Sequence, residues 1–89
     1  MTIHTSHGDV LKRLKRAHGH LAKVLEMLAS GEECLVVAQQ LQAVVNAICA
    51  AKTIHVQDHI EHCLAEALSG SHGDPKERIL EFKEIAKYL

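Results

Sequence analysis

Three residues with metal-binding side chains are spaced so that they could build one site: Cys34, His59 and Cys63. His59 and Cys63 are four residues apart, so a helix would place both side chains on one face. Thiolate and imidazole are the ligands that Cu(I), Zn(II) and related soft or borderline metals prefer. A free cysteine on its own is more often a small buried apolar residue. Only the three residues together predict a metal site.

The elements that must position these residues are helices. Leucines recur three or four residues apart and predict a first helix over residues 9–29. The pattern from Ser6 to Asp9 fits a capping box at its start, and Ser30-Gly31 ends it. Residues 1–8 are expected to form a flexible arm. The apolar face of this helix is a coiled-coil-like leucine seam with one polar member, formed by Leu11, Leu14, His18, Leu21, Leu25 and Leu28.

A second helix is expected over residues 32–68, because no Gly or Pro occurs between Gly31 and Gly70. At the standard helical rise it spans about 50 Å. Asp74 as N-cap and Pro75 at the first helical position begin a third helix over residues 75–88. The predicted fold is therefore all-α with three helices. A chain of 89 residues cannot bury so long a second helix, so that helix must pack against another subunit.

The length of the second helix decides how the metal site is built. Cys34 and His59 are 25 residues apart on one rigid helix, which is about 37 Å. They cannot meet within one chain. If two such helices pair antiparallel about a two-fold axis, Cys34 of one subunit lies beside His59 and Cys63 of the other. The sequence thus predicts two equivalent shared sites in an antiparallel four-helix-bundle dimer.

Charge is distributed unevenly along the chain. Residues 1–31 carry five basic and two acidic residues, whereas residues 32–89 carry five basic and nine acidic residues. One basic segment on an otherwise acidic chain indicates a polyanion partner. The residues expected to contact this partner are Lys12, Arg13, Lys15 and Arg16.

The remaining composition excludes several classes of protein. Aromatic residues make up only 2% of the chain, and the apolar residues are mostly those that suit helix-on-helix packing. We find no signal-peptide core and no apolar run long enough to span a bilayer, and expect a cytoplasmic protein. Three cysteines are an odd number, which does not fit a disulfide framework. No acid–base pair beyond the Cys/His set supports an enzyme, while a generic coiled-coil scaffold stays open as the simplest alternative.

Three sequence segments together resemble a known family: Arg13-Leu14-Lys15-Arg16 with Gly19-His20, the run from Cys34 to Leu41 with its Gln39-Gln40 pair, and His59-Ile60-Glu61-His62-Cys63. They are similar to segments of the small helical repressors that include the copper-sensing CsoR, the nickel/cobalt-sensing RcnR and the formaldehyde-sensing FrmR proteins. The resemblance covers nearly the whole chain. It implies a tetramer of two four-helix bundles that binds operator DNA without metal and releases it when the effector binds. The derepressed gene usually encodes an efflux or detoxification protein.

The chain departs from this family at one position and leaves the effector open. The family commonly has an Arg five residues after the glutamine pair, where this chain has Val45. Sensors of the RcnR type carry His at the position of Cys63, and persulfide sensors lack the middle histidine that His59 supplies. The alternative function is therefore a formaldehyde- or thiol-reactive sensor on the same fold, with Cys34 as nucleophile.

The histidines outside the core site bear on the identity of the metal. Trigonal coordination by Cys34, His59 and Cys63 suits Cu(I), whereas a further nitrogen ligand from the arm, His4 or His7, would suit Ni(II) or Co(II). The presence of these two histidines slightly favours nickel or cobalt over copper. His55 lies one turn before His59 and is a candidate to orient that ligand. We expect Cys49 in the core, and His20 and His62 facing solvent.

Overall fold

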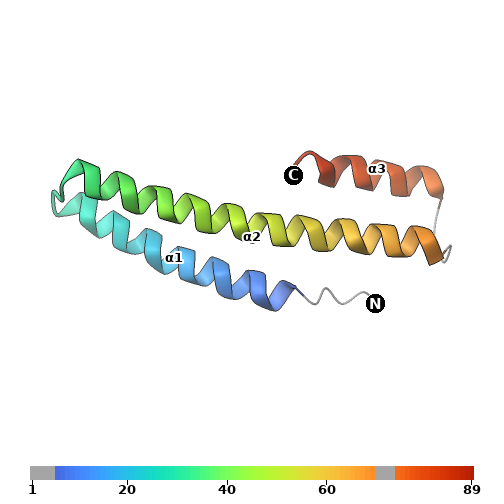
Figure 1. Ribbon diagram of the computed structural model, residues 1–89, viewed down its shortest axis with the longest axis horizontal. Coiled ribbons are helices and arrows are strands. Elements are labelled where there is room, and N and C mark those ends of the chain that lie inside the picture. The colour runs from blue at the N-terminus through green and yellow to red at the C-terminus, as the bar shows by residue number, and fades with distance from the viewer. Residues whose placement is uncertain (1–5, 70–73) are drawn as a thin grey trace.

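A computed structural model of the chain describes residues 6–69 and 74–89, and these residues form three helices and no strand (Figure 1). Helix α1 spans His7–Ala29, α2 spans Cys34–Ser69 and α3 spans Pro75–Ala86. Figure 1 shows α1 running antiparallel along the first part of α2, and α3 folding back along its last part. The expectation of an all-α chain with three helices is confirmed.

The α1–α2 hairpin is held by two heptad rows of small apolar residues. Val10, Ala17 and Val24 are the buried residues of α1. They face a matching row on α2, whose buried members Val37, Val44 and Ala51 are also seven residues apart. Small side chains on both helices let the backbones approach closely. The leucine seam expected to be the packing face of α1 does not face α2, and its leucines stay exposed.

The turn between α1 and α2 corrects the predicted start of the second helix. Gly31 has φ +77°, in the left-handed region that glycine adopts without strain. The N–H of Gly31 donates to the carbonyl of Leu28, and the N–H of Glu32 to that of Met27, at 3.2 and 3.0 Å. Both bonds close a Schellman motif at the end of α1. Because Glu32 belongs to this motif, α2 begins at Cys34 and not at residue 32.

The ends of the other helices also differ from the predicted bounds. Helix α1 begins at His7, so the last two residues of the expected arm, His7 and Gly8, are helical. Ser6 makes no side-chain capping hydrogen bond, so the expected capping box does not form. The expected start of α3 is observed: the Asp74 side chain accepts from the N–H of Lys76 at 3.0 Å and Pro75 follows it. Helix α3 ends at Ala86 rather than at residue 88.

A single chain is long, thin and poorly buried. Its dimensions are 57 × 22 × 14 Å. It exposes 6814 Å² of surface, against about 5,200 Å² expected for a compact monomer of its 9.8 kDa mass. The leucines of the seam are between 37% and 60% exposed. This much uncovered apolar surface is typical of a chain that completes its core with a partner.

One helix corrects the expectation that no segment could span a bilayer. By length and composition alone, α2 from Cys34 to Leu68 is apolar enough to cross a membrane. Core helices of soluble proteins reach the same length and apolar composition, so these two properties do not place α2 in a membrane. The row of Val37, Val44 and Ala51 that α2 buries against α1 fits a helix that packs with other helices.

Candidate functional site

The three predicted metal ligands all lie on α2, at its two ends. Cys34 is the first residue of the helix and is exposed, while His59 is half-buried and Cys63 buried near the other end. Cys34 and His59 are 25 residues apart, which corresponds to about 37 Å along the helix axis. Among the described residues, no three His, Cys, Asp or Glu side chains of one chain could hold a metal ion together. One chain therefore brings His59 near Cys63 but keeps Cys34 apart.

Cys34 lies on the apolar flank of α2 that a single chain leaves open. Leu41, Ile48 and His55 follow Cys34 at intervals of seven residues. Residues with this spacing lie on one face of a helix. Leu41 and Ile48 are exposed there. An apolar hollow of about 270 Å³ lies on the same flank between α1 and α2, lined by Val10, Leu14, Ile48, Ala51, Lys52 and His55. The predicted ligand at the start of α2, Cys34, thus shares its face with uncovered apolar residues.

The structure brings one histidine of the expected arm to α2. The ring of His7 stacks on the ring of His55, with the centroids 5.3 Å apart and the planes at 28°. His55 precedes His59 by one helical turn, so His7 lies at the end of α2 that carries the predicted histidine ligand. His4, the other candidate ligand, lies outside the described residues.

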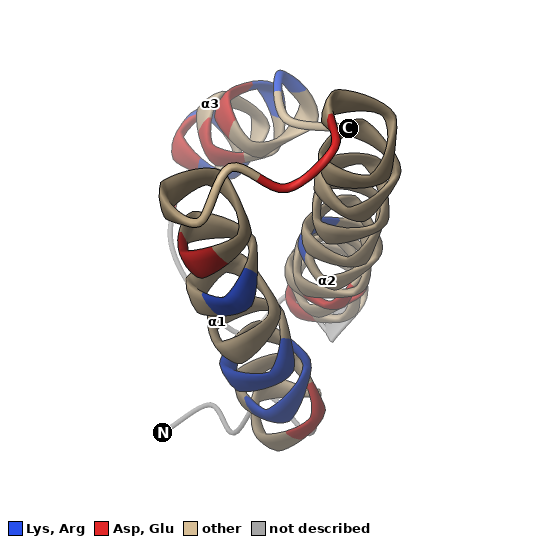
Figure 2. Cartoon of the chain, turned by 90° about the vertical axis from the view of Figure 1, so that its left-hand side faces the viewer, with Lys and Arg blue, Asp and Glu red and all other residues tan. Residues whose placement is uncertain are grey.

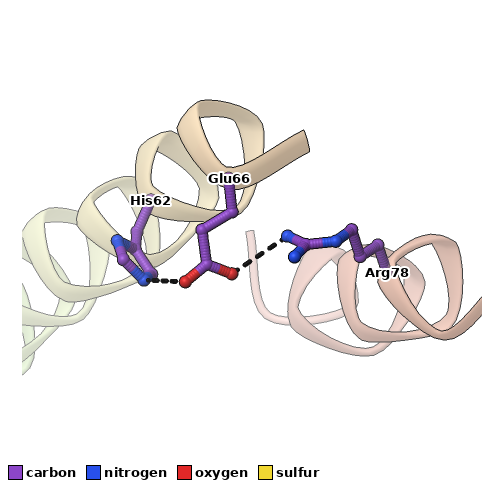
Figure 3. A network of polar contacts seen from close by, with 3 residues as sticks. All are labelled: His62, Glu66 and Arg78. Carbon is purple, nitrogen blue, oxygen red and sulfur yellow. Dashed lines mark hydrogen bonds and ion pairs between the residues drawn. The ribbon is translucent and has the colours of Figure 1, made fainter. Parts of the chain in front are cut away.

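Cys63 is buried. Charged residues of α2 and α3 lie near it, among them the Glu66–Arg78 pair that Figure 3 shows between the two helices. Burial raises the pKa of its thiol, the carboxylates of Glu81 and Glu66 raise it further, and Arg78 partly opposes them. Glu66 accepts from Arg78 of α3 at 3.0 Å and pairs with His62 at 2.8 Å. Partial burial alone would raise the pKa of the Glu66 carboxyl, but these two partners outweigh it and hold the pKa below its ordinary value.

The four predicted DNA-binding residues are all exposed on α1. Figure 2 shows the Lys and Arg positions gathered along this helix. Arg13 pairs with Asp9 one turn earlier, its Nε lying 3.0 Å from the carboxylate. Such exposed pairs are weak and exchange readily for another anion. The basic residues are therefore presented on the outside of the hairpin, on a helix that the valine and alanine rows fix against α2.

Several polar residues have contacts that sequence reasoning missed. His20 was expected to face solvent, but its Nε2 lies 2.7 Å from the side-chain oxygen of Gln40 and joins α1 to α2. His62 was also expected to face solvent and is instead half-buried against Glu66. The i, i+4 spacing of His62 and Glu66 is visible in the sequence, whereas the pairing of His20 with Gln40 needs the hairpin register. Cys49, expected in the core, is exposed in the single chain.

Comparison with known proteins agrees with this arrangement. The copper-sensing transcriptional repressor CsoR of Mycobacterium tuberculosis (strain ATCC 25618 / H37Rv) is 35% identical over 63 residues, which are 71% of this chain and 53% of that protein. CsoR of Bacillus subtilis (strain 168) is 28% identical over 79 residues, 89% of this chain and 76% of that protein. The chain spans about half the length of the mycobacterial relatives it matches.

A solved structure and a family pattern extend the similarity to the whole chain. The nickel-responsive transcriptional regulator InrS has the same fold, with a TM-score of 0.82 at 26% identity, covering 100% of this chain and 99% of that one. Residues 6–88 match the family described as metal-sensitive transcriptional repressor. The chain thus has the sequence pattern and the fold of the metal-sensitive class of transcriptional repressors. It belongs to the CsoR/RcnR family of repressors, whose members are not enzymes.

Proposed function

We propose that this protein is a metal-responsive transcriptional repressor that binds operator DNA in its metal-free form and releases it on binding Ni(II)/Co(II) or Cu(I). The released operator would derepress genes for efflux or detoxification. The observation that carries the proposal is the set of Cys34, His59 and Cys63 on α2, next to a helix that exposes Lys12, Arg13, Lys15 and Arg16. A cytoplasmic location follows from this role, because the operator DNA is there.

The proposed metal site is shared between two subunits. A rigid α2 keeps Cys34 about 37 Å from His59 within one chain, so a second chain must supply the missing ligand. Antiparallel pairing of two α2 helices would bring Cys34 of one subunit to His59 and Cys63 of the other. The open flank with Leu41 and Ile48, and the leucine seam of α1, would then be covered. Two such dimers would form the tetramer that we expect.

The donor set fits more than one metal. Two thiolates and one imidazole suit Cu(I), and an added nitrogen suits Ni(II) or Co(II). The position of His7 beside His55, one turn from His59, supports a nitrogen donor or an orienting group from the start of α1. The named relatives include copper-sensing and nickel-responsive proteins. We propose Ni(II) or Co(II) slightly ahead of Cu(I).

Release of DNA follows from where the ligands lie. A shared site joins the end of one α2 to the start of the other, and each α2 carries a basic α1 packed along it. When the ligands of the two chains approach each other to close the site, the two α2 helices shift relative to each other. This shift changes the relative placement of the two α1 helices. A ligand shifts a conformational equilibrium only by its differential affinity for the two states. The closed site would favour the arrangement in which the α1 helices no longer match the phosphates.

The test is a titration of reduced, metal-free protein bound to DNA. An operator is first selected from a pool of random duplexes by repeated binding. Cu(I), Ni(II), Co(II), Zn(II) and formaldehyde are then added separately while binding is followed by fluorescence anisotropy. Release by one metal at one equivalent per chain, lost in Cys34→Ala and His59→Ala, is the expected result.

The alternative is a formaldehyde- or thiol-reactive sensor that uses Cys34. The exposure of Cys34 at the start of α2 favours this second candidate, since a reactive thiol must be accessible. The same titration separates the two functions. Release by formaldehyde that survives His59→Ala, with no release by any metal, would replace the metal-sensing proposal.

A further inference from the structure

One of the three cysteines is covered and the other two are not. Cys34 and Cys49 are exposed, whereas Cys63 is only 9% exposed. Val56, seven residues earlier on the same face of α2, is also buried. Helix α3 folds back along the last part of α2 (Figure 1), and its Glu81 and Arg78 lie close enough to Cys63 to act on the pKa of the thiol. Helix α3 therefore covers the thiol that we assign to the metal site.

The apolar contact that holds α3 in place is thin. None of its residues from Pro75 to Ala86 is buried. Ile85 and Ala86 are half-buried, while Ile79 and Phe82 are 55% and 40% exposed. Elements with few buried apolar contacts open locally at lower cost than the rest of a protein. A polar contact between α2 and α3 can therefore weigh heavily in how long α3 stays closed.

Such a polar contact lies beside Cys63. Glu66 is three residues after Cys63, so its side chain is on the same face. Arg78 of α3 reaches back to it, with Nη1 3.0 Å from the carboxylate, and His62 pairs with the other carboxylate oxygen (Figure 3). The Arg78 and Glu66 side chains are 16% and 32% exposed, against 64% and 70% for the Lys87–Glu84 pair within α3. The pair that joins the two helices is thus the more shielded one.

We propose that α3 is a movable cover over Cys63, kept closed by the Glu66–Arg78 pair, and that opening of this cover controls how fast the thiol becomes available to a metal ion. The statement about the metal depends on the function proposed above. The statement about the thiol does not, and it can be tested without any metal or DNA.

The test measures alkylation of Cys63 as the only thiol, in a Cys34→Ser/Cys49→Ser background, by the neutral reagent N-ethylmaleimide. Arg78→Ala should increase the rate roughly two- to five-fold, the range expected for loss of a modest ion pair. Lys87→Ala, which breaks the exposed pair within α3, is the matched control and should leave the rate unchanged. Arg78→Lys should restore most of the protection.

The direction of the change separates a cover from a purely electrostatic effect. Arg78 opposes the rise in the pKa of the Cys63 thiol. Its removal from a closed α3 would therefore reduce the thiolate fraction and slow alkylation. Faster alkylation supports the cover, whereas an unchanged or slower rate overturns it.

A destabilised variant away from both ends of α2 controls for global unfolding. Val44 packs with Val24 and Val37 and lies ten residues after Cys34 and nineteen before Cys63, so Val44→Ala weakens the core away from the cover and from the proposed shared site. If Val44→Ala accelerates alkylation as much as Arg78→Ala does, the thiol is exposed by global unfolding and the proposal is wrong. If only Arg78→Ala accelerates it, local opening of α3 is supported.

The part of the proposal that concerns the metal is tested on the chain with all three cysteines. Stopped-flow binding of the metal that gives release in the DNA titration should be faster in Arg78→Ala by the factor seen in alkylation. Faster alkylation without faster metal binding would overturn the part of the proposal that concerns the metal, and leave α3 as a cover of the thiol alone. If no metal binds while alkylation is still accelerated, the proposed function fails and the cover stands.

Discussion

The imidazole of His7, in the first turn of α1, stacks on the imidazole of His55 with a centroid distance of 5.3 Å. This contact joins the start of the basic helix to the part of α2 that lies one turn before His59. A histidine thus connects the element proposed to bind DNA with the end of α2 that carries two of the proposed metal ligands.

The contact leads to a prediction about the identity of the metal. Replacing His7 by Ala should lower the affinity for Ni(II) or Co(II) by roughly 10- to 100-fold, because a nitrogen donor or an orienting partner of a ligand is lost. Affinity for Cu(I), which three ligands satisfy, should hardly change and is the internal control. Competition with chelators of known affinity measures both. Equal affinities for every metal in His7→Ala and the parent would make copper the better assignment.

The exposed basic residues of α1 give a prediction about DNA. Arg16→Ala should weaken binding to all duplex sequences and lower the slope of log affinity against log salt by about one for each engaged subunit. Metal affinity should stay the same. Fluorescence anisotropy at several salt concentrations measures the slope, with Lys87→Ala on α3 as a matched loss of one exposed cation. If Arg16→Ala and Arg13→Ala both keep the parent affinity and slope, the assigned DNA-binding face is wrong.

The leucine seam predicts that the chain is oligomeric. Leu21 and Leu25 are exposed in the single chain and would be covered in a four-helix bundle. Leu25→Glu should therefore shift the protein from a dimer or tetramer toward a monomer, because a carboxylate in an apolar interface is costly to bury. Light scattering measures the mass, and Leu89→Glu at the exposed C-terminus is the control. A parent protein that is monomeric at micromolar concentration would contradict the shared site as well.

The sequence predicted the helices well and their contact faces poorly. Helix number and the long uninterrupted α2 follow from periodicity and from the absence of Gly and Pro, which are local signals. Which face of α1 meets α2 does not follow, because both the leucine seam and the Val10, Ala17, Val24 row have helical spacing. The smaller residues form the contact within the chain, since α2 offers a matching row of small residues.

In the candidate site, too, features set by one helix could be predicted and contacts between helices could not. The i, i+4 relation of His59 and Cys63, and the separation of both from Cys34, depend only on helix geometry and could be predicted. The contacts of His20 with Gln40 and of Arg78 with Glu66 could not, because each joins residues of two helices whose register is set by tertiary packing.

The pair of Glu66 with Arg78 predicts a pH dependence of stability. The pKa of the Glu66 carboxyl is lowered in the folded chain, so its contribution is present above its unfolded pKa of about 4.3 and is lost as the pH falls through the lower folded value. Glu66→Gln should melt slightly below the parent at pH 6 to 7. The difference should shrink as the pH is lowered below about 4.3. Circular dichroism melts of both proteins give the comparison, and a difference that grows on acidification would contradict the assignment.

The central claim is that each metal site is built from two chains, because α2 holds Cys34 about 37 Å from His59. Its most direct test co-refolds two differently tagged variants, Cys34→Ala and His59→Ala/Cys63→Ala, and isolates the heterodimer through both tags. In that heterodimer one site lacks all three ligands, and the other has Cys34 from one chain and His59 with Cys63 from its partner. Metal titration should find one tight site per heterodimer and none in either parent homodimer. A heterodimer that binds metal no better than its parents would contradict the shared site.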